Sequence, residues 1–278
     1  MTTVRVATRG SLLALTQTSW VVDQLKQANP DVNFELVTFK TVGDKVLDVA
    51  LSQIGGKGLF TKELEEALLD GRADLAVHSL KDMPTDFPAG LVLGCVPPRE
   101  DPRDVVITAT GGNFSSLPAG ARVGTSSLRR LAQLKAKRPD LEYVSIRGNV
   151  DTRLRKLAEG QVDALIMAAA GLHRAGFADR ITEYLEPDFC LPAPGQGALA
   201  IEIRENDSAV GAMVSRIHDS QTALEIMAER ALLARMEGGC PVPIGALAYF
   251  ENESMHLDGL IASPDGSQVI RYGADAPV

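Results

Sequence analysis

Apolar residues follow two different spacings in the first third of the chain. Short β-rich runs predict strands at 4–8, 34–39 and 73–79. The segments between them, 11–28 and 59–71, carry apolar residues at helical spacing and predict helices. Because strands and helices alternate, this part of the chain is expected to form parallel β-α-β units of an α/β fold.

A similar order of predicted elements returns between residues 121 and 171. A short match accompanies it, since Val-Ala-Thr at 6–8 corresponds to Val-Gly-Thr at 123–125. The stretch CLPAPGQGALAIEIRE at 190–205 then predicts a Pro/Gly-rich joint and a strand that returns to the first lobe. Two crossings of the chain make this joint the expected hinge between two lobes of like topology.

The end of the chain predicts a smaller domain. Residues 220–239 have apolar residues at helical spacing, with Ser220 or Thr222 near the start and two glycines at the end. Three β-rich runs follow and predict an antiparallel sheet packed on that helix. The predicted fold class is therefore α/β, with two similar lobes like those of periplasmic binding proteins joined by a hinge, plus a small α+β C-terminal domain. The expected boundaries are 1–98 and 198–217 for the first lobe, 99–197 for the second lobe and 218–278 for the C-terminal domain.

The first of the two similar sets of predicted elements contains an extra segment between its second strand and second helix. This segment is KTVGDKVLDVALSQIGGKG at 40–58. Long segments without a sustained period are often lids over a binding site, so we interpret it as a flap. The alternative is a solvated insertion.

Composition narrows the class of protein. With 45% hydrophobic and 23% charged residues, the 278-residue chain can fill the cores of two or three domains. The net charge of −8 disfavours a nucleic-acid partner. Three widely spaced cysteines, Cys95, Cys190 and Cys240, fit neither a disulfide framework nor a zinc site, and no metal is expected. A cytoplasmic protein with no membrane partner is expected, because neither a signal pattern nor a long apolar run occurs.

The predicted strand ends carry cations and hydroxyl groups. Thr8, Arg9 and Ser11 follow the first strand, where the next helix begins. In the second lobe the corresponding positions hold hydroxyl groups and five arginines: Thr125, Ser126, Ser127, Arg129, Arg130, Arg147, Arg153 and Arg174. Helix N-termini together with guanidinium groups form anion sites, so the pattern predicts a ligand with several negative charges. Solvated surface arginines are the alternative.

One acidic residue stands out at the end of the last strand of the first copy. In HSLKDMP, Asp82 lies beside Lys81 and just before a proline. A carboxylate near cations stays ionised and can stabilise a developing cation or move a proton, although it can also simply cap a turn. His78 could equally be a core histidine. Cys240 lies in the stiff turn MEGGCPVPIG, directly after the predicted helix. The helix dipole opposes a thiolate at this end, so we expect a thiol that is alkylated once rather than a nucleophile of low pKa.

Taken together, these residues resemble the porphobilinogen deaminase (hydroxymethylbilane synthase) family. The matching motifs run in order along almost the whole chain: VRVATRGSLLAL, GDKVLDVALSQIGGKGLFTKELEEALL, DLAVHSLKDMPT, VGTSSLRR, IRGNVDTRL, LPAPGQGALAIE and ERALLARMEGGCPVPIG. The resemblance implies a transferase of tetrapyrrole and heme biosynthesis. Such an enzyme joins four porphobilinogen units, with loss of ammonia, on a dipyrromethane cofactor and releases hydroxymethylbilane. A monomer is also implied.

The resemblance assigns roles to individual positions. Cys240 would attach dipyrromethane through a thioether. Asp82 would be the catalytic residue, bonding pyrrole N–H groups and stabilising positive charge as ammonia leaves. The remaining cofactor contacts would come from Ser79, Lys81, Thr125, Ser127, Arg129, Arg130, Arg147 and Arg153. Substrate or the lengthening chain would contact Arg9, Ser11, Gln17, Arg147, Arg153 and Arg174, while Lys57 and Phe60 would belong to the flap.

Two other classes of protein fit parts of the pattern. A two-lobed anion-binding or sensing protein without catalysis would share the lobes, the hinge and the cationic strand ends. A nucleic-acid binder is suggested only by LRRLAQLKAKR. One departure from the family is the tail. Family sequences usually continue with helical sequence after QVIR, whereas YGADAPV follows here, so we expect that residues are missing at this end or that the chain is truncated.

Overall fold

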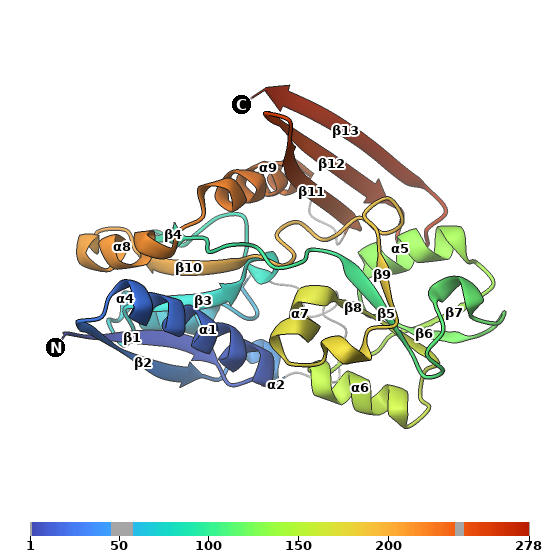
Figure 1. The fold of residues 1–278 in the computed structure, drawn as a ribbon, viewed down its shortest axis with the longest axis horizontal. Helices are drawn as coiled ribbons and strands as arrows, with labels where there is room; N and C mark the ends of the chain where they lie inside the picture. Colours follow the sequence, from blue (N-terminus) through green and yellow to red (C-terminus); the bar gives the residue numbers. More distant parts are fainter. Residues whose placement is uncertain (1, 46–57, 237–241, 278) are drawn as a thin grey trace. The chain divides into compact units, whose positions relative to one another are not determined.

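The computed structural model describes residues 2–45, 58–236 and 242–277 (Figure 1). The chain forms two compact units. Unit 1 comprises Met1–Arg99 and Ala198–Leu224, and unit 2 comprises Glu100–Gly197 and Glu225–Val278. The chain therefore passes between the units three times, after Arg99, Gly197 and Leu224.

Unit 1 is built on a five-stranded sheet with the strand order β2-β1-β3-β10-β4. Strands β1, β2 and β3 run parallel, whereas β10 runs antiparallel to both of its neighbours, β3 and β4. The strands span β1 Thr2–Arg9, β2 Val32–Phe39, β3 Leu75–Ser79, β4 Leu91–Cys95 and β10 Leu199–Arg204.

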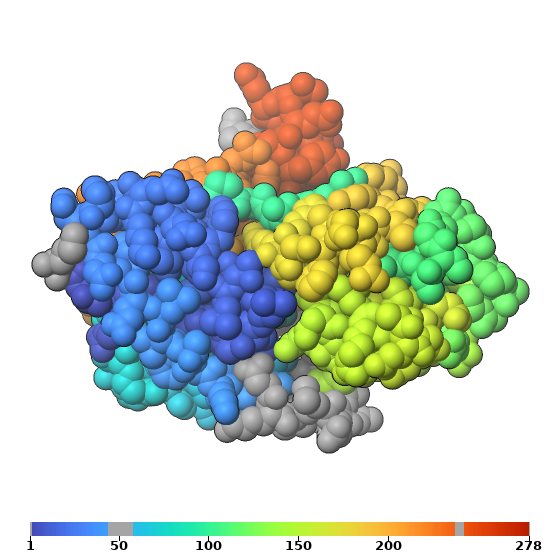
Figure 2. Space-filling model, turned by 60° about the horizontal axis from the view of Figure 1, so that its bottom comes forward, coloured from blue at the N-terminus to red at the C-terminus, as the bar shows by residue number. Residues whose placement is uncertain are grey.

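Helices cover both faces of this sheet. The unit-1 helices are α1 Leu12–Ala28, α2 Val42–Lys45, α4 Lys62–Leu69 and α8 Ser208–Val214, followed by the short helix η4 Ser215–Ile217. Residues of α1 and α8 share a core with alternate residues of β1 and β3, such as Val6 and Val77. Leu64 and Leu68 of α4 pack against Ala7 and Ala76, whose side chains lie on the other face of the sheet. Because successive side chains of each strand point to opposite faces, the sheet has a separate hydrophobic layer on each face. In Figure 2 the described residues before 99, in blue and cyan, pack into one continuous body.

Unit 2 contains a second sheet of the same design, with the order β7-β6-β8-β5-β9. Strands β6, β7 and β8 are parallel, and β5 is antiparallel to β8 and β9. The strands span β5 Asp104–Thr108, β6 Arg122–Gly124, β7 Glu142–Val144, β8 Ala164–Ala168 and β9 Glu183–Leu185. The helices are α5 Leu128–Lys137, α6 Val150–Ala158 and α7 Ala169–Arg174, with short turns η2 Phe114–Ser116 and η3 Ala178–Arg180.

The two sheets confirm the predicted duplication and fold class. Each has three parallel strands, then one antiparallel strand, then an edge strand. The antiparallel strand comes from a different part of the chain in each case, since β5 precedes its parallel strands and β10 follows the second copy. As predicted, the 190–205 stretch ends in a strand, β10, that returns to the first sheet. The sequence analysis missed β4, β5 and β9.

The C-terminal part of the chain is a helix, which begins in unit 1 and continues in unit 2, and a sheet. The helix α9 spans Ser220–Met236, and the antiparallel sheet has the order β11-β12-β13, with β11 Ile244–Glu251, β12 Ser254–Ala262 and β13 Val269–Pro277. A Cβ placed on Gly259 of β12 would lie 2.8 Å from Leu232 of α9, so helix and sheet are in close contact, as predicted. Leu247 and Leu260 of the sheet also share a core with Ala132 of α5.

Candidate functional site

The carboxyl ends of the parallel strands in unit 1 bring several predicted site residues to one edge of the sheet. β1 and β3 lie side by side and parallel, so Arg9 at the end of β1 and Ser79 at the end of β3 share that edge. The helix α1 begins there as well. Its N-cap is Ser11, whose hydroxyl oxygen accepts a hydrogen bond from the amide of Ala14 at 3.3 Å.

Gln17 connects α1 to the end of β3. Its side chain is buried, and its Oε1 accepts a hydrogen bond from Oγ of Ser79 at 3.1 Å. A buried amide that is hydrogen-bonded in this way holds the strand end in a fixed position. The structure therefore brings together two predicted ligand-contacting residues that lie 62 positions apart in sequence.

The segment after β3 is the short helix η1, Leu80–Asp82. Leu80 and Met83 are buried, whereas Lys81 and Asp82 between them are exposed. The amide of Leu80 also donates to the carbonyl of Ala198, which is 3.1 Å away in the same unit. Buried anchors on both sides thus hold the exposed carboxylate of Asp82 at the carboxyl edge of the sheet.

The predicted flap residue Phe60 lies against Arg9. The guanidinium carbon of Arg9 is 4.2 Å from the centre of the Phe60 ring, which is a cation–π arrangement. The amide of Gly43 donates to the carbonyl of Leu59, so the two described ends of the 40–58 segment are joined. Lys57, the other predicted flap residue, lies outside the described residues.

In unit 2 the hydroxyl residues that follow β6 organise the start of α5. Ser127 is the N-cap of α5, and its Oγ accepts from the amide of Arg130 at 3.4 Å. Oγ1 of Thr125 accepts from the amide of Ser127 at 3.2 Å. These hydroxyl groups satisfy amides of the first turn, which is the ordinary structural use of such residues.

Arg129 and Arg130 are buried and paired with a single acid, Asp104 of β5. Nη1 of Arg129 lies 2.7 Å from Oδ2 of Asp104, and Nη2 of Arg130 lies 2.7 Å from Oδ1. Burial would raise the pKa of Asp104, but the two adjacent positive charges outweigh it and hold that pKa far below its usual range. The two arginines also donate to backbone carbonyls, to the Cys190 sulfur and to the Gln196 amide oxygen of the same unit. These contacts give both residues a structural role, and their predicted contact with cofactor carboxylates stays a prediction.

Sequence reasoning missed Asp104. The signal available was an acid at the start of the apolar run DVVIT, a position that is costly unless a cation pairs with it.

Three other arginines lie near the carboxyl edge of the second sheet. Nε of Arg153 on α6 donates to the carbonyl of Gly148 at 2.8 Å. Gly148 has a φ of 118°, and an added Cβ would lie 2.7 Å from Thr152, so this turn requires glycine. Arg147 precedes the same turn and is half-buried, and its carbonyl accepts from Lys156 at 3.1 Å. Arg147 and Arg153 therefore lie on either side of the turn that follows β7.

Arg174 closes the α7 helix after β8. Its Nη2 donates to the carbonyl of Gly197 at 2.9 Å. Burial lowers the pKa of Arg174 to about 10, and the negative charge of Glu100 only partly offsets this effect. A partly desolvated guanidinium that donates to a neutral carbonyl is well suited to receive a carboxylate.

Both cysteines among the described residues are buried. Cys95 and Cys190 are both free thiols in hydrophobic clusters, and Cys190 also contacts Arg129 and Asp104. Burial raises the pKa of each to about 12. Cys240 lies outside the described residues. The helix that leads toward it, α9, is held by Glu229, another residue that the sequence analysis missed. The Glu229 carboxylate accepts from the amides of Gly195 and Ala248 at 2.6 and 2.9 Å.

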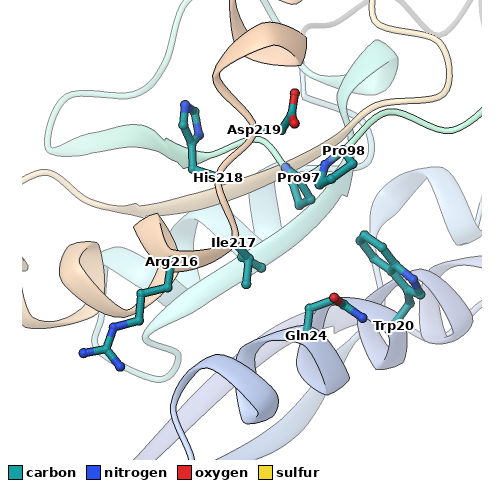
Figure 3. A pocket seen from close by; sticks show the side chains of 8 residues that line it. All are labelled: Trp20, Gln24, Pro97, Pro98, Arg216, Ile217, His218 and Asp219. Carbon is teal, nitrogen blue, oxygen red and sulfur yellow. The ribbon is translucent and has the colours of Figure 1, made fainter.

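The described residues contain no group of three or more His, Cys, Asp or Glu side chains that could hold a metal ion. None of their helices is long and apolar enough to cross a membrane. Unit 1 also has a surface cavity of about 280 Å³, lined by Trp20, Gln24, Pro97, Pro98, Arg216, Ile217, His218 and Asp219 (Figure 3). None of the predicted site residues lines it.

Comparison with known protein families explains why two α/β lobes, the exposed Asp82 and cations at the strand ends occur in one chain. Residues 4–212 match the family described as "Porphobilinogen deaminase, dipyromethane cofactor binding domain". Residues 223–277 match "Porphobilinogen deaminase, C-terminal domain". The chain belongs to the porphobilinogen deaminase family. The resemblance found in the sequence motifs is thereby confirmed.

Curated porphobilinogen deaminases are similar over nearly the whole chain. The enzyme of Syntrophotalea carbinolica is 52% identical over 99% of this chain and 87% of its own length. That of a Geobacillus strain is 54% identical over 98% of this chain and 88% of its own. The Bacillus subtilis porphobilinogen deaminase is 52% identical over 98% of this chain and 87% of its own.

More distant likeness is found among solved structures. The substrate-binding domain of a molybdenum ABC transporter from Clostridium difficile covers 82% of this chain and is itself covered to 97%, with 12% identity and a TM-score of 0.49. The assignment of this chain to the porphobilinogen deaminases rests on the sequence matches.

Proposed function

We propose that this chain is a hydroxymethylbilane synthase that uses Asp82 as its catalytic residue and Cys240 as the attachment point of its dipyrromethane cofactor. The reaction is that of the porphobilinogen deaminase family: four porphobilinogen units are joined head to tail with loss of ammonia, and hydroxymethylbilane is released. The observation that carries the proposal is the match of residues 4–212 to the family's cofactor-binding domain, which contains the exposed Asp82.

The described residues fit a cofactor and a substrate that carry carboxylates. Pyrroles with acetate and propionate side chains need cations and N–H donors rather than an apolar pocket. Unit 1 offers Arg9 and Lys81 at the carboxyl edge of its sheet, and unit 2 offers Arg147, Arg153 and Arg174. Arg174 supports this reading because its guanidinium donates to a neutral carbonyl, and an approaching carboxylate would offset the burial that lowers its pKa.

Asp82 is proposed to act as the acceptor of pyrrole N–H groups. Its carboxylate is exposed while its neighbours Leu80 and Met83 are buried, so it is presented on a rigid base. A fixed carboxylate stabilises the positive charge that develops when porphobilinogen loses ammonia, and this stabilisation needs no reorganisation during the reaction. When bound, dipyrromethane supplies the free α-carbon to which the first porphobilinogen is joined.

Cys240 is proposed as the attachment point. The burial of Cys95 and Cys190 supports this assignment, because thiols with a pKa near 12 and no access to solvent cannot be alkylated readily. Glu229 would support the site indirectly by fixing the helix that precedes it.

The remaining assignments belong to the same proposal. The cofactor would also contact Ser79, Lys81, Thr125, Ser127, Arg129, Arg130, Arg147 and Arg153, and substrate would contact Arg9, Ser11, Gln17, Arg147, Arg153 and Arg174. Lys57 and Phe60 would belong to a flap. The domains are proposed to end at the boundaries predicted from the sequence. We further propose a cytoplasmic monomer with no nucleic-acid partner.

The proposed function is tested by mixing the purified protein with porphobilinogen and following both ammonia and substrate. We expect one ammonia to be released for each porphobilinogen consumed, over many turnovers. Binding of porphobilinogen without release of ammonia would instead indicate the non-catalytic anion-binding protein.

A further inference from the structure

The layer between α1 and the first sheet ends in buried polar side chains, two of which have no role in the reaction described above. Val6 of β1 and Val77 of β3 belong to its hydrophobic part. Two positions further along each strand, on the same face, the residues are Thr8 and Ser79. Thr8 is 0% exposed, and so is Thr18 of α1. Because a buried hydroxyl group is costly unless it is hydrogen-bonded, both threonines need partners inside this layer.

The two threonines are hydrogen-bonded to each other. Oγ1 of Thr18 donates to Oγ1 of Thr8 at 2.6 Å, and Oγ1 of Thr8 in turn donates to the carbonyl of Ala14 at 3.3 Å. The same carbonyl lies 2.8 Å from Oγ1 of Thr18. The amide of Ala14 donates to the hydroxyl oxygen of Ser11, the N-cap of α1. A continuous set of hydrogen bonds therefore connects the end of β1 to the N-cap of α1.

The residue next to Thr18 makes a similar connection to β3. Gln17 accepts from the hydroxyl group of Ser79, as described above. The end of β3 is also held on the other face of the sheet, where Nε2 of His78 lies 3.0 Å from Oε2 of Glu202 on β10. Helix α1 thus connects the end of β1 to a strand end that is fixed by a second, separate contact.

The end of β1 extends past its pairing with β3. The two strands pair at Val6 and Ala7, whereas Thr8 and Arg9 pair on the other side with β2, an edge strand. By strand alternation Thr8 faces α1 and Arg9 points to the opposite face, where its guanidinium stacks on the Phe60 ring. A shift of Thr8 relative to α1 would therefore move Arg9 as well.

We propose that Thr8 and Thr18 are positioning residues whose buried hydroxyl pair fixes Arg9 and Ser11 in the arrangement that receives a carboxylate of porphobilinogen. The role in substrate binding rests on the proposed function. Both hydroxyl groups are bonded inside the protein, so they act through the end of β1 and the first turn of α1. Two apolar side chains would fill the same space, but hydrophobic contacts have no direction, whereas a satisfied buried network specifies one geometry.

The test breaks the pair from either side in the cofactor-loaded protein. Thr18→Val and Thr8→Val keep the shape of the side chain and remove its hydroxyl group, and the double variant removes both groups. Thr18→Ser retains the hydroxyl group. Thr16→Val is the matched control, because Thr16 is a half-buried residue of α1 that also donates to the carbonyl four residues earlier, that of Leu12 at 2.9 Å. The readouts are kcat and KM for porphobilinogen, with cofactor content measured by intact mass.

We expect KM to rise about tenfold in Thr18→Val and in Thr8→Val, because displaced binding groups lose part of a charge-assisted hydrogen bond to the substrate. The value of kcat should stay within about twofold, as for a loss of binding that affects ground state and transition state alike. The double variant should be no worse than either single variant, because both remove the same bond. In Thr18→Ser and Thr16→Val, KM should stay within about twofold of the wild type.

Three results would overturn the proposal. The first is an unchanged KM in a folded Thr18→Val or Thr8→Val protein. The second is a double variant in which the two effects add fully, because the threonines would then act separately. The third is a Thr18→Ser protein as impaired as Thr18→Val, which would assign the effect to packing rather than to the hydroxyl group.

A measurement without substrate separates this inference from the proposed function. Hydrogen–deuterium exchange read by mass spectrometry follows the amides of residues 9–15, among them those of Ala14 and Leu15, which are bonded to Ser11. We expect these amides to exchange at least about tenfold faster in Thr18→Val and Thr8→Val, because the segment opens more readily. Thr18→Ser and Thr16→Val should exchange like the wild type.

Unchanged exchange in the two valine variants would overturn the anchoring of the β1 end. If exchange rises as expected but the wild-type protein releases no ammonia from porphobilinogen, the anchoring stands and the proposed function fails. Where only one of the two valine variants folds, that variant carries both measurements with the same expected results.

Discussion

Asp104 and Arg130 are joined by two hydrogen bonds, from Nε and Nη2 of the arginine to Oδ1 of the carboxylate at 2.9 and 2.7 Å. Arg129 contributes a third bond to the same buried acid. This arrangement connects the antiparallel strand β5 to the first turn of α5. Two arginines that look like ligand-binding residues in the sequence thus also hold the core of unit 2 together.

Removing the charge of Asp104 should destabilise the protein strongly. In Asp104→Asn two buried guanidinium groups lose their counter-ion, for which we expect a loss of about 3–5 kcal/mol in the free energy of unfolding. The matched control is Asp163→Asn, whose acid pairs with Arg122 while 43% exposed and should contribute about 0–1 kcal/mol. Urea denaturation followed by circular dichroism measures both. Equal and small effects would contradict a structural role for Asp104.

The same pair predicts how stability depends on pH. The pKa of Asp104 is depressed in the folded protein, so its contribution is complete above the unfolded value of about 4 and is lost as pH falls through the folded value. The stability difference between wild type and Asp104→Asn should therefore be constant from pH 7 to about pH 5 and shrink only in stronger acid. A difference that disappears already near pH 6 would assign the stabilisation to another group.

Asp82→Asn should leave the fold and the cofactor in place but slow turnover. The side chain is exposed, so the change costs little stability, whereas a lost catalytic carboxylate should lower kcat by about 10²–10⁴-fold. Asp23→Asn, an exposed acid on α1, serves as the control. Steady-state assays with porphobilinogen measure kcat, and intact mass confirms the cofactor. Turnover of Asp82→Asn near that of the control would remove Asp82 from its catalytic role.

Arg174→Gln should weaken the binding of porphobilinogen. A hydrogen bond to a charged group contributes about 1.5–3 kcal/mol, so KM should rise at least about tenfold while cofactor content is unchanged. Arg155→Gln is the control, since Arg155 is 65% exposed and pairs with Glu159 on the same helix. Because the pKa of Arg174 is lowered to about 10, the wild-type KM should also begin to rise above about pH 9. A KM that does not change in Arg174→Gln would place the substrate elsewhere.

Cys95 and Cys190 should resist alkylation in the native protein. Their pKa values of about 12 leave almost no thiolate at pH 8, and both side chains are closed to solvent. Iodoacetamide labelling followed by peptide mapping should leave both thiols unmodified until the protein is denatured, when both should react. Rapid labelling of either one under native conditions would show that its core opens readily.

Local patterns predicted much of the fold. The parallel strands and their helices were identified because alternating and helical spacings are properties of contiguous residues. The duplication was also visible, since similar tripeptides lie at the ends of β1 and β6. Strands β4, β5 and β9 were missed because they lie outside the repeated strand–helix pattern and are positioned by pairing with strands distant in the sequence.

The site could be predicted in part for the same reason. Arg9, Ser79 and Asp82 follow strands, and strand ends of a parallel sheet meet at one edge. In contrast, the Arg129–Asp104 and His78–Glu202 pairs join residues 25 and 124 positions apart, and no local pattern encodes such contacts. The sequence therefore identified which side chains carry charge, but not which charges are neutralised inside the protein.

The central claim is tested most directly by denaturing intact-mass spectrometry of the purified protein, with peptide mapping of residues 236–245. We predict an added mass equal to one dipyrromethane, carried on the peptide that contains Cys240. Protein isolated without it should gain the same mass on that peptide after incubation with porphobilinogen. A Cys240 peptide that stays unmodified after this incubation, or an added mass found on Cys95 or Cys190, would contradict the account.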